Sequence, residues 1–167
     1  MLGRGLLAAI LAAALDQASK AWVLGYFGED GCALHRHIVS SFLDIVLTCN
    51  RGVSFGVLNR TGVNSLMFSL VAAVIVVALA IWLSRVRVGF LAMAIGLVIG
   101  GAIGNVIDRL RFGAVIDFLY FHAGSWYWPA FNLADSAICL GVAVMLLDGL
   151  VTRRPPRQAK RGEDVAP

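Results

Sequence analysis

Four long apolar runs dominate the chain, at about 5–24, 61–84, 88–109 and 134–151. Each is long enough for an α-helix to cross the hydrocarbon core of a membrane, which takes about 20 residues. The run at 61–84 carries no charged residue, and the run at 88–109 carries none before Asp108 and Arg109 at its end. The pattern predicts four membrane-spanning helices.

The first run also begins as a secretory signal would, because Arg4 precedes it. Asp16 and Lys20, however, interrupt this run where a cleavage region would lie, and three more apolar runs follow. We therefore interpret it as a retained first helix.

The connections at about 25–60 and 110–133 contain runs that are typical of β-strands. Residues 42–49 are rich in strand formers and end at the turn signal Asn50-Arg51-Gly52, and residues 115–121 form a second such run. Seven aromatic residues lie between 118 and 131, a clustering that is typical of the headgroup layer of a membrane. These patterns predict a small sheet on the outer membrane surface.

The composition excludes a water-soluble monomer. Of the 167 residues, 59% are apolar and 14% are charged, and the mean hydropathy is +0.82, whereas soluble domains are about one-quarter charged. A chain of this length has no room for seven spans. We predict one integral membrane domain over residues 1–152 and a disordered basic tail at 153–167, which has no apolar period.

The net charge of +4 would point to nucleic acid as a partner in a soluble protein. Here the basic residues are better interpreted as signals of membrane topology. Eight of the fourteen Lys and Arg residues flank the runs on one side of the predicted membrane: Arg4, Arg85, Arg87, Arg153, Arg154, Arg157, Lys160 and Arg161. By the positive-inside rule both termini are cytoplasmic and the connections at 25–60 and 110–133 face outward. No nucleic acid is expected as a partner.

No pattern in the chain indicates a metal ion or a cofactor. The odd count of three cysteines predicts neither a disulfide framework nor a metal cluster. The histidines have no carboxylate at metal-ligand spacing, which argues against a zinc protease, and His35 and His37 are expected in a solvated loop. Ser54 in Gly-Val-Ser-Phe-Gly matches a serine-hydrolase elbow only superficially, because the strand-to-helix context of that motif is not evident.

Charged residues within or beside a span are hypotheses of function by default, because they are costly in a membrane. Asp16 and Lys20 are four positions apart and share one helix face. The simplest interpretation is an ion pair within the helix, with the lysine ammonium reaching the membrane interface. Asp16 lies deeper than this interpretation explains, so a role at a site stays open for it.

The end of the third run combines close packing with polar side chains. Asn105, Asp108 and Arg109 fall on one helix face, and an aspartate beside an arginine is usually ionised and engaged. We therefore expect these three residues to form a structural clamp at the end of the helix. Glycines at every fourth position let a neighbouring helix approach closely. Three glycines have this spacing: Gly96, Gly100 and Gly104.

Asp117 and Asp135 are the candidates for catalysis. Asp117 is flanked by apolar residues with no adjacent cation, and an unpaired carboxylate in such a place is costly. Asp135 begins the fourth run, so a helix cap is the alternative role for this residue. If the fold brings the two together, they can share one proton, and one carboxylate can deprotonate a water while the other polarises a carbonyl. That is the chemistry of an aspartic peptidase, and spacing alone does not establish the contact.

These residues fall in motifs that resemble those of the lipoprotein signal peptidases (signal peptidase II), a family of aspartic peptidases of the bacterial inner membrane. Each motif alone is weak, and five in this order are highly specific. They are Asp16-Gln-x-x-Lys20, Asn50-Arg-Gly-x-Ser-Phe-Gly56, Gly100-Gly-Ala-x-Gly-Asn-x-x-Asp-Arg109, Val115-Ile-Asp-Phe118 and Phe131-Asn-x-Ala-Asp-Ser136.

The resemblance implies a mainly α membrane fold of four transmembrane helices with a small β-sheet cradle on the outer, periplasmic face at residues 38–59 and 113–121. It implies an aspartic endopeptidase that removes the signal peptide from prolipoproteins, cutting before the diacylglyceryl-modified cysteine, without a cofactor. The catalytic pair would be Asp117 and Asp135. The residues that bind substrate or support the site would be Asp16, Lys20, Asn50, Gly52, Asn105, Asp108, Arg109 and Asn132. One departure is Arg51, where a small residue such as threonine is expected.

A small transporter or membrane scaffold is the alternative function, since buried polar groups can also line a pathway. The polar residues gather near the predicted outer face, and residues 88–99 carry no polar side chain, which favours the peptidase. The expected partners are a diacylglyceryl-modified prolipoprotein and membrane lipids. Nothing in the sequence demands a partner subunit, so a monomer is expected.

Overall fold

Four long helices form the body of the molecule. They are α1 (Leu2–Phe27), α2 (Val63–Arg85), α3 (Gly89–Phe112) and α4 (Leu133–Val151). The computed structural model describes residues 1–28, 35–52 and 63–151, so the tail predicted at 153–167 and Ser54 lie outside the described residues. Within the described ranges, these four helices are long and apolar enough to cross a membrane. The prediction of four spans is confirmed.

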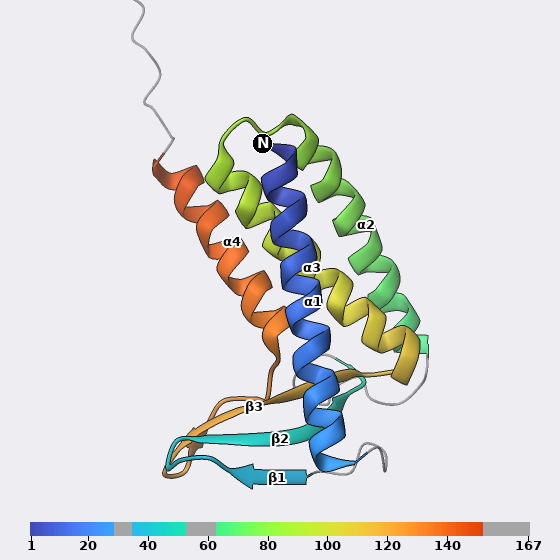
Figure 1. Cartoon of the computed structure of the whole chain (residues 1–167), viewed down its shortest axis with the longest axis vertical. Helices are drawn as coiled ribbons and strands as arrows, with labels where there is room; N and C mark the ends of the chain where they lie inside the picture. The colour runs from blue at the N-terminus through green and yellow to red at the C-terminus, as the bar shows by residue number, and fades with distance from the viewer. Residues whose placement is uncertain (29–34, 53–62, 152–167) are drawn as a thin grey trace, which may run out of the picture.

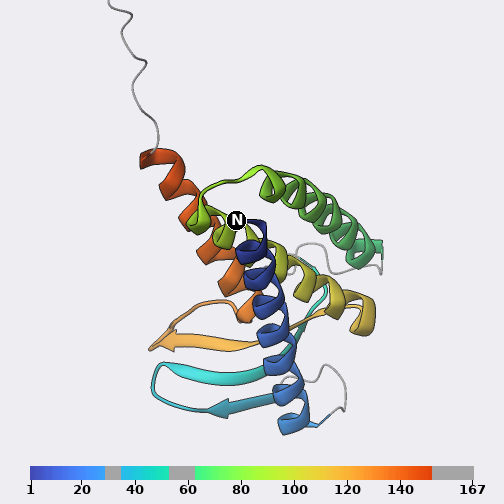
Figure 2. The ribbon, with the colours of Figure 1, turned by 45° about the horizontal axis from the view of Figure 1, so that its top comes forward.

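The helix α3 lies among the other three helices and is the most buried of the four (Figure 1, Figure 2). Two of its glycines lie where neighbouring backbones approach, because Gly96 faces the carbonyl of Gly5 on α1 and Gly101 faces the carbonyl of Ala134 on α4. By contrast, α2 and α4 present most of their apolar side chains to the surroundings. Such an exposed apolar surface is expected of helices that are solvated by lipid.

A four-stranded antiparallel sheet lies across one end of the bundle (Figure 1). Its strands are β1 (His35–Ile38), β2 (Leu43–Asn50), β3 (Val115–Ala123) and β4 (Trp126–Tyr127), in the spatial order β1-β2-β3-β4. The predicted small sheet is confirmed. The loop expected around His35 and His37 is wrong, since both residues lie in β1 and pair with Leu47 and Ile45 of β2. An edge strand needs backbone pairing more than an apolar face, so its sequence carries little strand signal.

An apolar cluster joins the sheet to the bundle. It is formed by Val23 of α1, Leu47 of β2, and Ile116 and Phe118 of β3, all buried. Phe118 is therefore a core residue, and its grouping with the aromatics of the headgroup layer is wrong. The sheet is held against the outer turns of α1 by this cluster.

The aromatic residues at the far edge of the sheet are exposed, as a headgroup location requires. Trp126, Tyr127 and Trp128 are 58%, 64% and 55% exposed. Rings of this kind are stable where an apolar body can enter lipid and a polar edge can stay in water.

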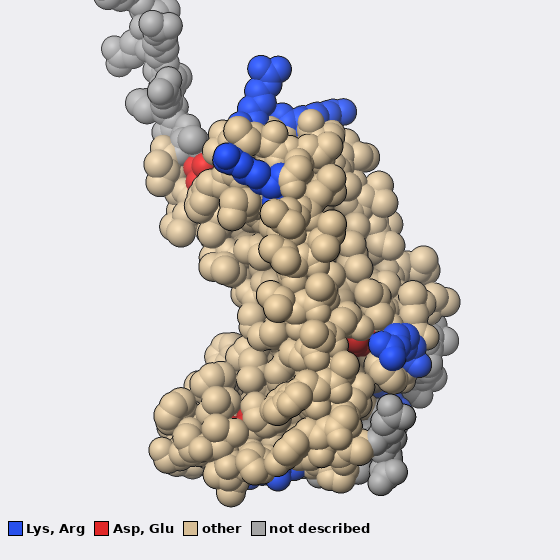
Figure 3. Space-filling view, viewed as in Figure 1, with Lys and Arg blue, Asp and Glu red and all other residues tan. Residues whose placement is uncertain are grey.

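The two ends of the molecule differ from its middle in charge. The N-terminus, the turn between α2 and α3, and the end of α4 lie at the end opposite the sheet (Figure 1). On the face shown in Figure 3, Lys and Arg residues gather toward the two ends, and the helical surface between them is almost free of charge. An uncharged belt between charged ends is the distribution that a membrane selects.

The odd cysteine count did not predict the disulfide that the structure contains. Cys49, at the end of β2, is disulfide-bonded, whereas Cys139 on α4 is free. One bridge with one cysteine left over is compatible with an odd count, and spacing along the chain carries no signal for it.

Gly96→Ala should loosen the contact between α1 and α3. The added methyl group would overlap the carbonyl oxygen of Gly5, and overpacking of this kind costs about 1–3 kcal/mol. Thermal unfolding of the purified protein in detergent measures the loss as a lower midpoint temperature. Gly3→Ala is the matched control, because nothing lies within 4 Å of a methyl group at that position. An unchanged midpoint for Gly96→Ala would contradict the close contact.

Candidate active site

The alternation of side chains along β2 and β3 brings Asn50 beside Asp117. Across the two strands, Asp117 pairs with Thr48, and Val115 pairs with Asn50. Successive side chains of a strand point to opposite faces of the sheet. The side chains of Asp117 and Asn50 therefore lie on one face, and Ile116 points to the other.

Two amide groups hold the carboxyl group of Asp117, which is only 2% exposed. Its Oδ2 accepts a hydrogen bond from Asn50 Nδ2 at 3.1 Å, and its Oδ1 accepts one from Asn132 Nδ2 at 2.7 Å. Burial, and then the charge of Asp135, raise the pKa of Asp117 to about 7 against the opposing effect of these two hydrogen bonds. Near neutral pH the group is therefore present in both its protonated and its ionised form.

The turn after β2 orients the amide of Asn50. The backbone N–H of Gly52 donates to Asn50 Oδ1 at 3.1 Å, as in an Asx turn. With its oxygen occupied in this way, Asn50 presents its NH₂ group to Asp117. The side chain of Arg51 between them is exposed.

Asp135 lies in the first turn of α4 and forms a capping box with Asn132. The backbone N–H of Asp135 donates to Asn132 Oδ1 at 2.9 Å, and the backbone N–H of Asn132 donates to Asp135 Oδ2 at 3.4 Å. The cap considered from the sequence is thus present, but it uses one carboxylate oxygen. The other, Oδ1, accepts a hydrogen bond from Asn105 Nδ2 of α3 at 2.9 Å.

Asn132 brings the two candidate carboxylates together. Its side-chain NH₂ group donates to Asp117 and its backbone N–H donates to Asp135. The same NH₂ group also lies 3.2 Å from the carbonyl oxygen of Ile116, which fixes the amide relative to β3. Two residues that are eighteen positions apart in the sequence therefore share one neighbour.

A cavity of about 240 Å³ opens beside Asp135. Its wall comes from four separate parts of the fold, so it is a junction of the sheet with α2, α3 and α4. The lining residues are Asn50, Gly52, Phe68, Asn105, Arg109, Val115 and Asp135.

On the α1 side of α3, Lys20 lies between two carboxylates. Its Nζ is 2.7 Å from Asp16 Oδ2 and 2.7 Å from Asp108 Oδ2, and the side chains are 2%, 0% and 0% exposed for Lys20, Asp16 and Asp108. The ion pair predicted within the helix is confirmed. The interpretation that the lysine reaches the interface is wrong, because the second carboxylate draws its ammonium into the bundle.

These two carboxylates also accept hydrogen bonds from backbone N–H groups beside the candidate catalytic residues. Asp16 Oδ1 accepts from the N–H of Ala134 at 2.9 Å, and Asp108 Oδ2 accepts from the N–H of Ile116 at 3.1 Å. Ala134 and Ile116 are each adjacent in sequence to a candidate catalytic residue. The ion-pair network thus holds the start of α4 and of β3 in place.

The clamp expected between Asp108 and Arg109 is wrong, because the cation that pairs with Asp108 is Lys20. Arg109 Nη1 instead donates to the backbone carbonyl of Asn105 at 3.3 Å, and its guanidinium lies 5.8 Å from the centre of the Phe68 ring. Adjacent helix residues point about 100° apart. Asp108 and Arg109 therefore face different neighbours, and Arg109 is left to line the cavity.

Two residues that the structure places at the site, Gln17 and Phe68, were not among the site residues predicted from the sequence. Gln17 donates to Asp108 Oδ1 at 2.9 Å and to the carbonyl of Gly104 at 3.2 Å, and its place in the motif Asp16-Gln-x-x-Lys20 was the signal for it. Phe68 has no signal at all, because one phenylalanine in an uncharged span is indistinguishable from a lipid-facing one. Among the described residues, no group of three or more His, Cys, Asp or Glu side chains could hold a metal ion.

Comparison with known proteins gives a consistent answer over almost the whole chain. A family described as Signal peptidase (SPase) II matches residues 8–151. A lipoprotein signal peptidase of Methylorubrum extorquens (strain PA1) is 44% identical over 154 residues, which cover 92% of this chain and 88% of that protein. One of Rhodopseudomonas palustris (strain TIE-1) is 45% identical over 152 residues, covering 88% of this chain and 92% of that protein.

The fold is also similar to that of a solved protein. A bacterial membrane enzyme determined by the in meso method at 2.3 Å superimposes with a TM-score of 0.75 at 26% identity, covering 95% of each chain.

Asn132→Ala should be less stable than Asn132→Ser. Both variants lose the amide bond to Asp117, but serine keeps an oxygen that can cap α4, and loss of a cap costs about 1 kcal/mol. The difference between the two midpoints of thermal unfolding in detergent therefore measures the cap alone. Equal midpoints would show that Asn132 does not stabilise the helix in this way.

Proposed function

The chain belongs to the signal peptidase II family, and we propose that it is an aspartic endopeptidase that removes the signal peptide from prolipoproteins. In this proposal the cut falls before the diacylglyceryl-modified cysteine, at the outer surface of the bacterial inner membrane. The observation that carries the proposal is the pair of carboxylates, Asp117 and Asp135, which share Asn132, with Asp135 lining a cavity.

The two carboxylates have different surroundings, which supports different roles for them. Asp117 is buried with a pKa raised to about 7, so it can hold a proton at neutral pH. Asp135 accepts hydrogen bonds from Asn105 and from a helix N-terminus, and both stabilise the carboxylate form. We assign the shared proton to Asp117 and the role of general base to Asp135.

With this assignment the reaction balances. Asp135 takes a proton from a water molecule while the water oxygen bonds to the carbonyl carbon of the scissile peptide, and Asp117 gives its proton to the carbonyl oxygen. Asp135 then passes its proton to the peptide nitrogen as the C–N bond breaks. Asp117 recovers a proton from the diol as the new carboxyl group forms, so the pair ends with one proton, as it began.

The location of the site suits a substrate that stays in the bilayer. The cavity lies where the sheet meets the helices, so a signal helix could remain in lipid while its scissile bond reaches the carboxylates. Asn50, Gly52 and Arg109 line this cavity, and we assign them to binding of the substrate backbone. We place this end of the bundle on the periplasmic side, with both termini cytoplasmic, and expect a monomer among membrane lipids.

Asp117→Asn and Asp135→Asn should each reduce cleavage of a diacylglyceryl-modified prolipoprotein peptide. The loss of a general acid or base lowers kcat by about 100- to 10,000-fold, while thermal unfolding should show both variants folded. Asp148→Asn, in the last turns of α4, and Asp44→Asn, buried in β2, are matched controls that should retain cleavage. Undiminished cleavage by either variant of the pair would refute its assignment.

The rate should fall on the alkaline side of about pH 7, because Asp117 must carry a proton and has a pKa of about 7. Above that pH, kcat/KM should drop about tenfold per pH unit. The hydrogen bond from Asn50 lowers the pKa of Asp117, so Asn50→Leu should move this alkaline limb to higher pH, whatever it does to the maximal rate. A limb that stays in place, or moves to lower pH, would contradict the assignment of the proton.

A further inference from the structure

Asn105 lies between the buried ammonium of Lys20 and the carboxylate of Asp135. Lys20 Nζ lies 3.2 Å from Asn105 Oδ1, and Asn105 Nδ2 lies 2.9 Å from Asp135 Oδ1. One amide therefore connects the ion-pair network of α1 to a carboxylate on the other side of α3. Neither the aspartic chemistry nor the bracing of the helices uses this connection.

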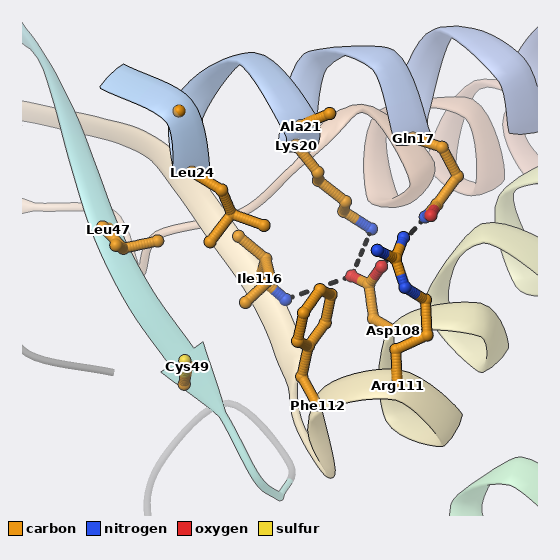
Figure 4. Close-up of a pocket in the computed structure, with 11 residues that line it drawn as sticks. Gln17, Lys20, Ala21, Leu24, Leu47, Cys49, Asp108, Arg111, Phe112 and Ile116 are labelled. Carbon is orange, nitrogen blue, oxygen red and sulfur yellow. Dashed lines mark hydrogen bonds and ion pairs between the residues drawn. The ribbon is translucent and has the colours of Figure 1, made fainter. Parts of the chain in front are cut away.

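The ammonium has three hydrogens and three acceptors. Asp16 and Asp108 accept two of them at 2.7 Å each, and Asn105 accepts the third. Figure 4 shows Lys20 and Gln17 reaching from α1 to Asp108, whose carboxylate also receives the N–H of Ile116. Two carboxylates already neutralise the lysine, so its third contact is not needed for charge.

The third contact determines which way the Asn105 amide faces. An ammonium can only donate and an ionised carboxylate can only accept, so the amide oxygen must face Lys20 and the NH₂ group must face Asp135. Asn132 Nδ2, at 3.3 Å from Asn105 Oδ1, favours the same orientation. With the amide reversed, its NH₂ group would meet the ammonium and its oxygen would meet the carboxylate, and both contacts are repulsive.

We propose that Lys20 is a positioning residue for the general base: through the Asn105 amide it presents an N–H group to Asp135 and fixes the orientation of that carboxylate. The inference rests on the proposed function, since it assigns the base role to Asp135. It differs from bracing of the helices, because a brace acts through Asp16 and Asp108 and requires nothing of Asn105.

Three charged groups from three elements act on the pair. Asp117 interacts with Asp135 from β3 and Arg109 from α3, and Lys20 reaches Asp135 from α1 through Asn105 while its charge also acts directly on Asp117. The residue of α2 that lines the cavity, Phe68, is uncharged. Removing Lys20 still leaves Arg109, whose guanidinium interacts with both carboxylates of the pair.

A double-mutant cycle tests the connection. Lys20→Met, Asn105→Ala and the double variant are purified in detergent and assayed on a diacylglyceryl-modified prolipoprotein peptide, for kcat and KM. Each single change should lower kcat about 10- to 100-fold, as expected when a hydrogen bond to a charged group is lost, with KM little changed.

The double variant should be no worse than the poorer single variant, because both changes remove the same hydrogen bond. Losses that multiply would overturn the proposal, since Lys20 would then act independently of Asn105. A lower midpoint of thermal unfolding with an unchanged kcat would leave Lys20 as a brace only.

Lys20→Met leaves two carboxylates buried without a cation, which is strongly destabilising. A parallel cycle in the Asp108→Asn background leaves only one such carboxylate and keeps the test available if the first variant does not fold. Arg111→Gln is the matched control. It removes a positive charge from the pocket that both Arg111 and Lys20 line (Figure 4). It should change kcat by less than about twofold, as is usual for an exposed charge.

The two proposals fail differently. If Asp135→Asn still cleaves the peptide, the proposed function is wrong whatever Lys20 does. If Asp135→Asn is inactive and the cycle is additive, only the role of Lys20 is wrong.

Discussion

The arrangement of the site depends on one buried ammonium between two buried carboxylates. Removing three charged groups from water costs several kcal/mol for each ion, and their attraction compensates only if the remaining oxygens are also hydrogen-bonded. Here the remaining oxygen of Asp16 accepts from the backbone N–H of Ala134, and that of Asp108 accepts from Gln17. The Asp108 oxygen that pairs with Lys20 also accepts from the N–H of Ile116. The condition that makes the ion pair tolerable therefore also sets where α4 and β3 begin. Because Asp135 and Asp117 are the next residues along the chain, the charge network determines the position of both.

The polar groups nearer the cavity also serve two purposes each. Asn132 caps α4 and holds Asp117, while Asp135 completes the capping box and presents its second oxygen to Asn105. A helix N-terminus in a low-dielectric region must satisfy its N–H groups. Groups recruited for that purpose are rigid, and rigidity is what a pair of proton-transferring carboxylates requires. Stability and reactivity at this junction thus share their hydrogen bonds.

The sequence predicts those features that depend on local composition. Apolar runs predict the four helices, strand formers predict β2 and β3, and the isolated charges identify the polar side chains that gather at one end. It does not predict β1, whose residues carry no apolar alternation, or the cation that Asp108 selects. Helical spacing pairs Asp16 with Lys20 correctly, since they lie on the same helix, but Asp108 meets Lys20 only after α1 and α3 pack across their glycines. The adjacency of Asp108 and Arg109 was misleading for the same reason, because helix geometry points neighbours in sequence toward different partners.

Three asparagines surround the two carboxylates, at positions where an added charge would change how the pair holds its protons. Asn50, Asn105 and Asn132 each donate to a carboxylate of the pair. Lysine in these places would neutralise the carboxylates outright and hold both ionised, and aspartate would add a third negative charge that favours double protonation. An amide stabilises a carboxylate by a hydrogen bond while adding no net charge, so the pair can keep one proton between them. It can also carry the influence of a distant cation, because its oxygen and its NH₂ group must face opposite partners. In the proposed mechanism, neutral amides around the two carboxylates are therefore the arrangement that lets them exchange one proton.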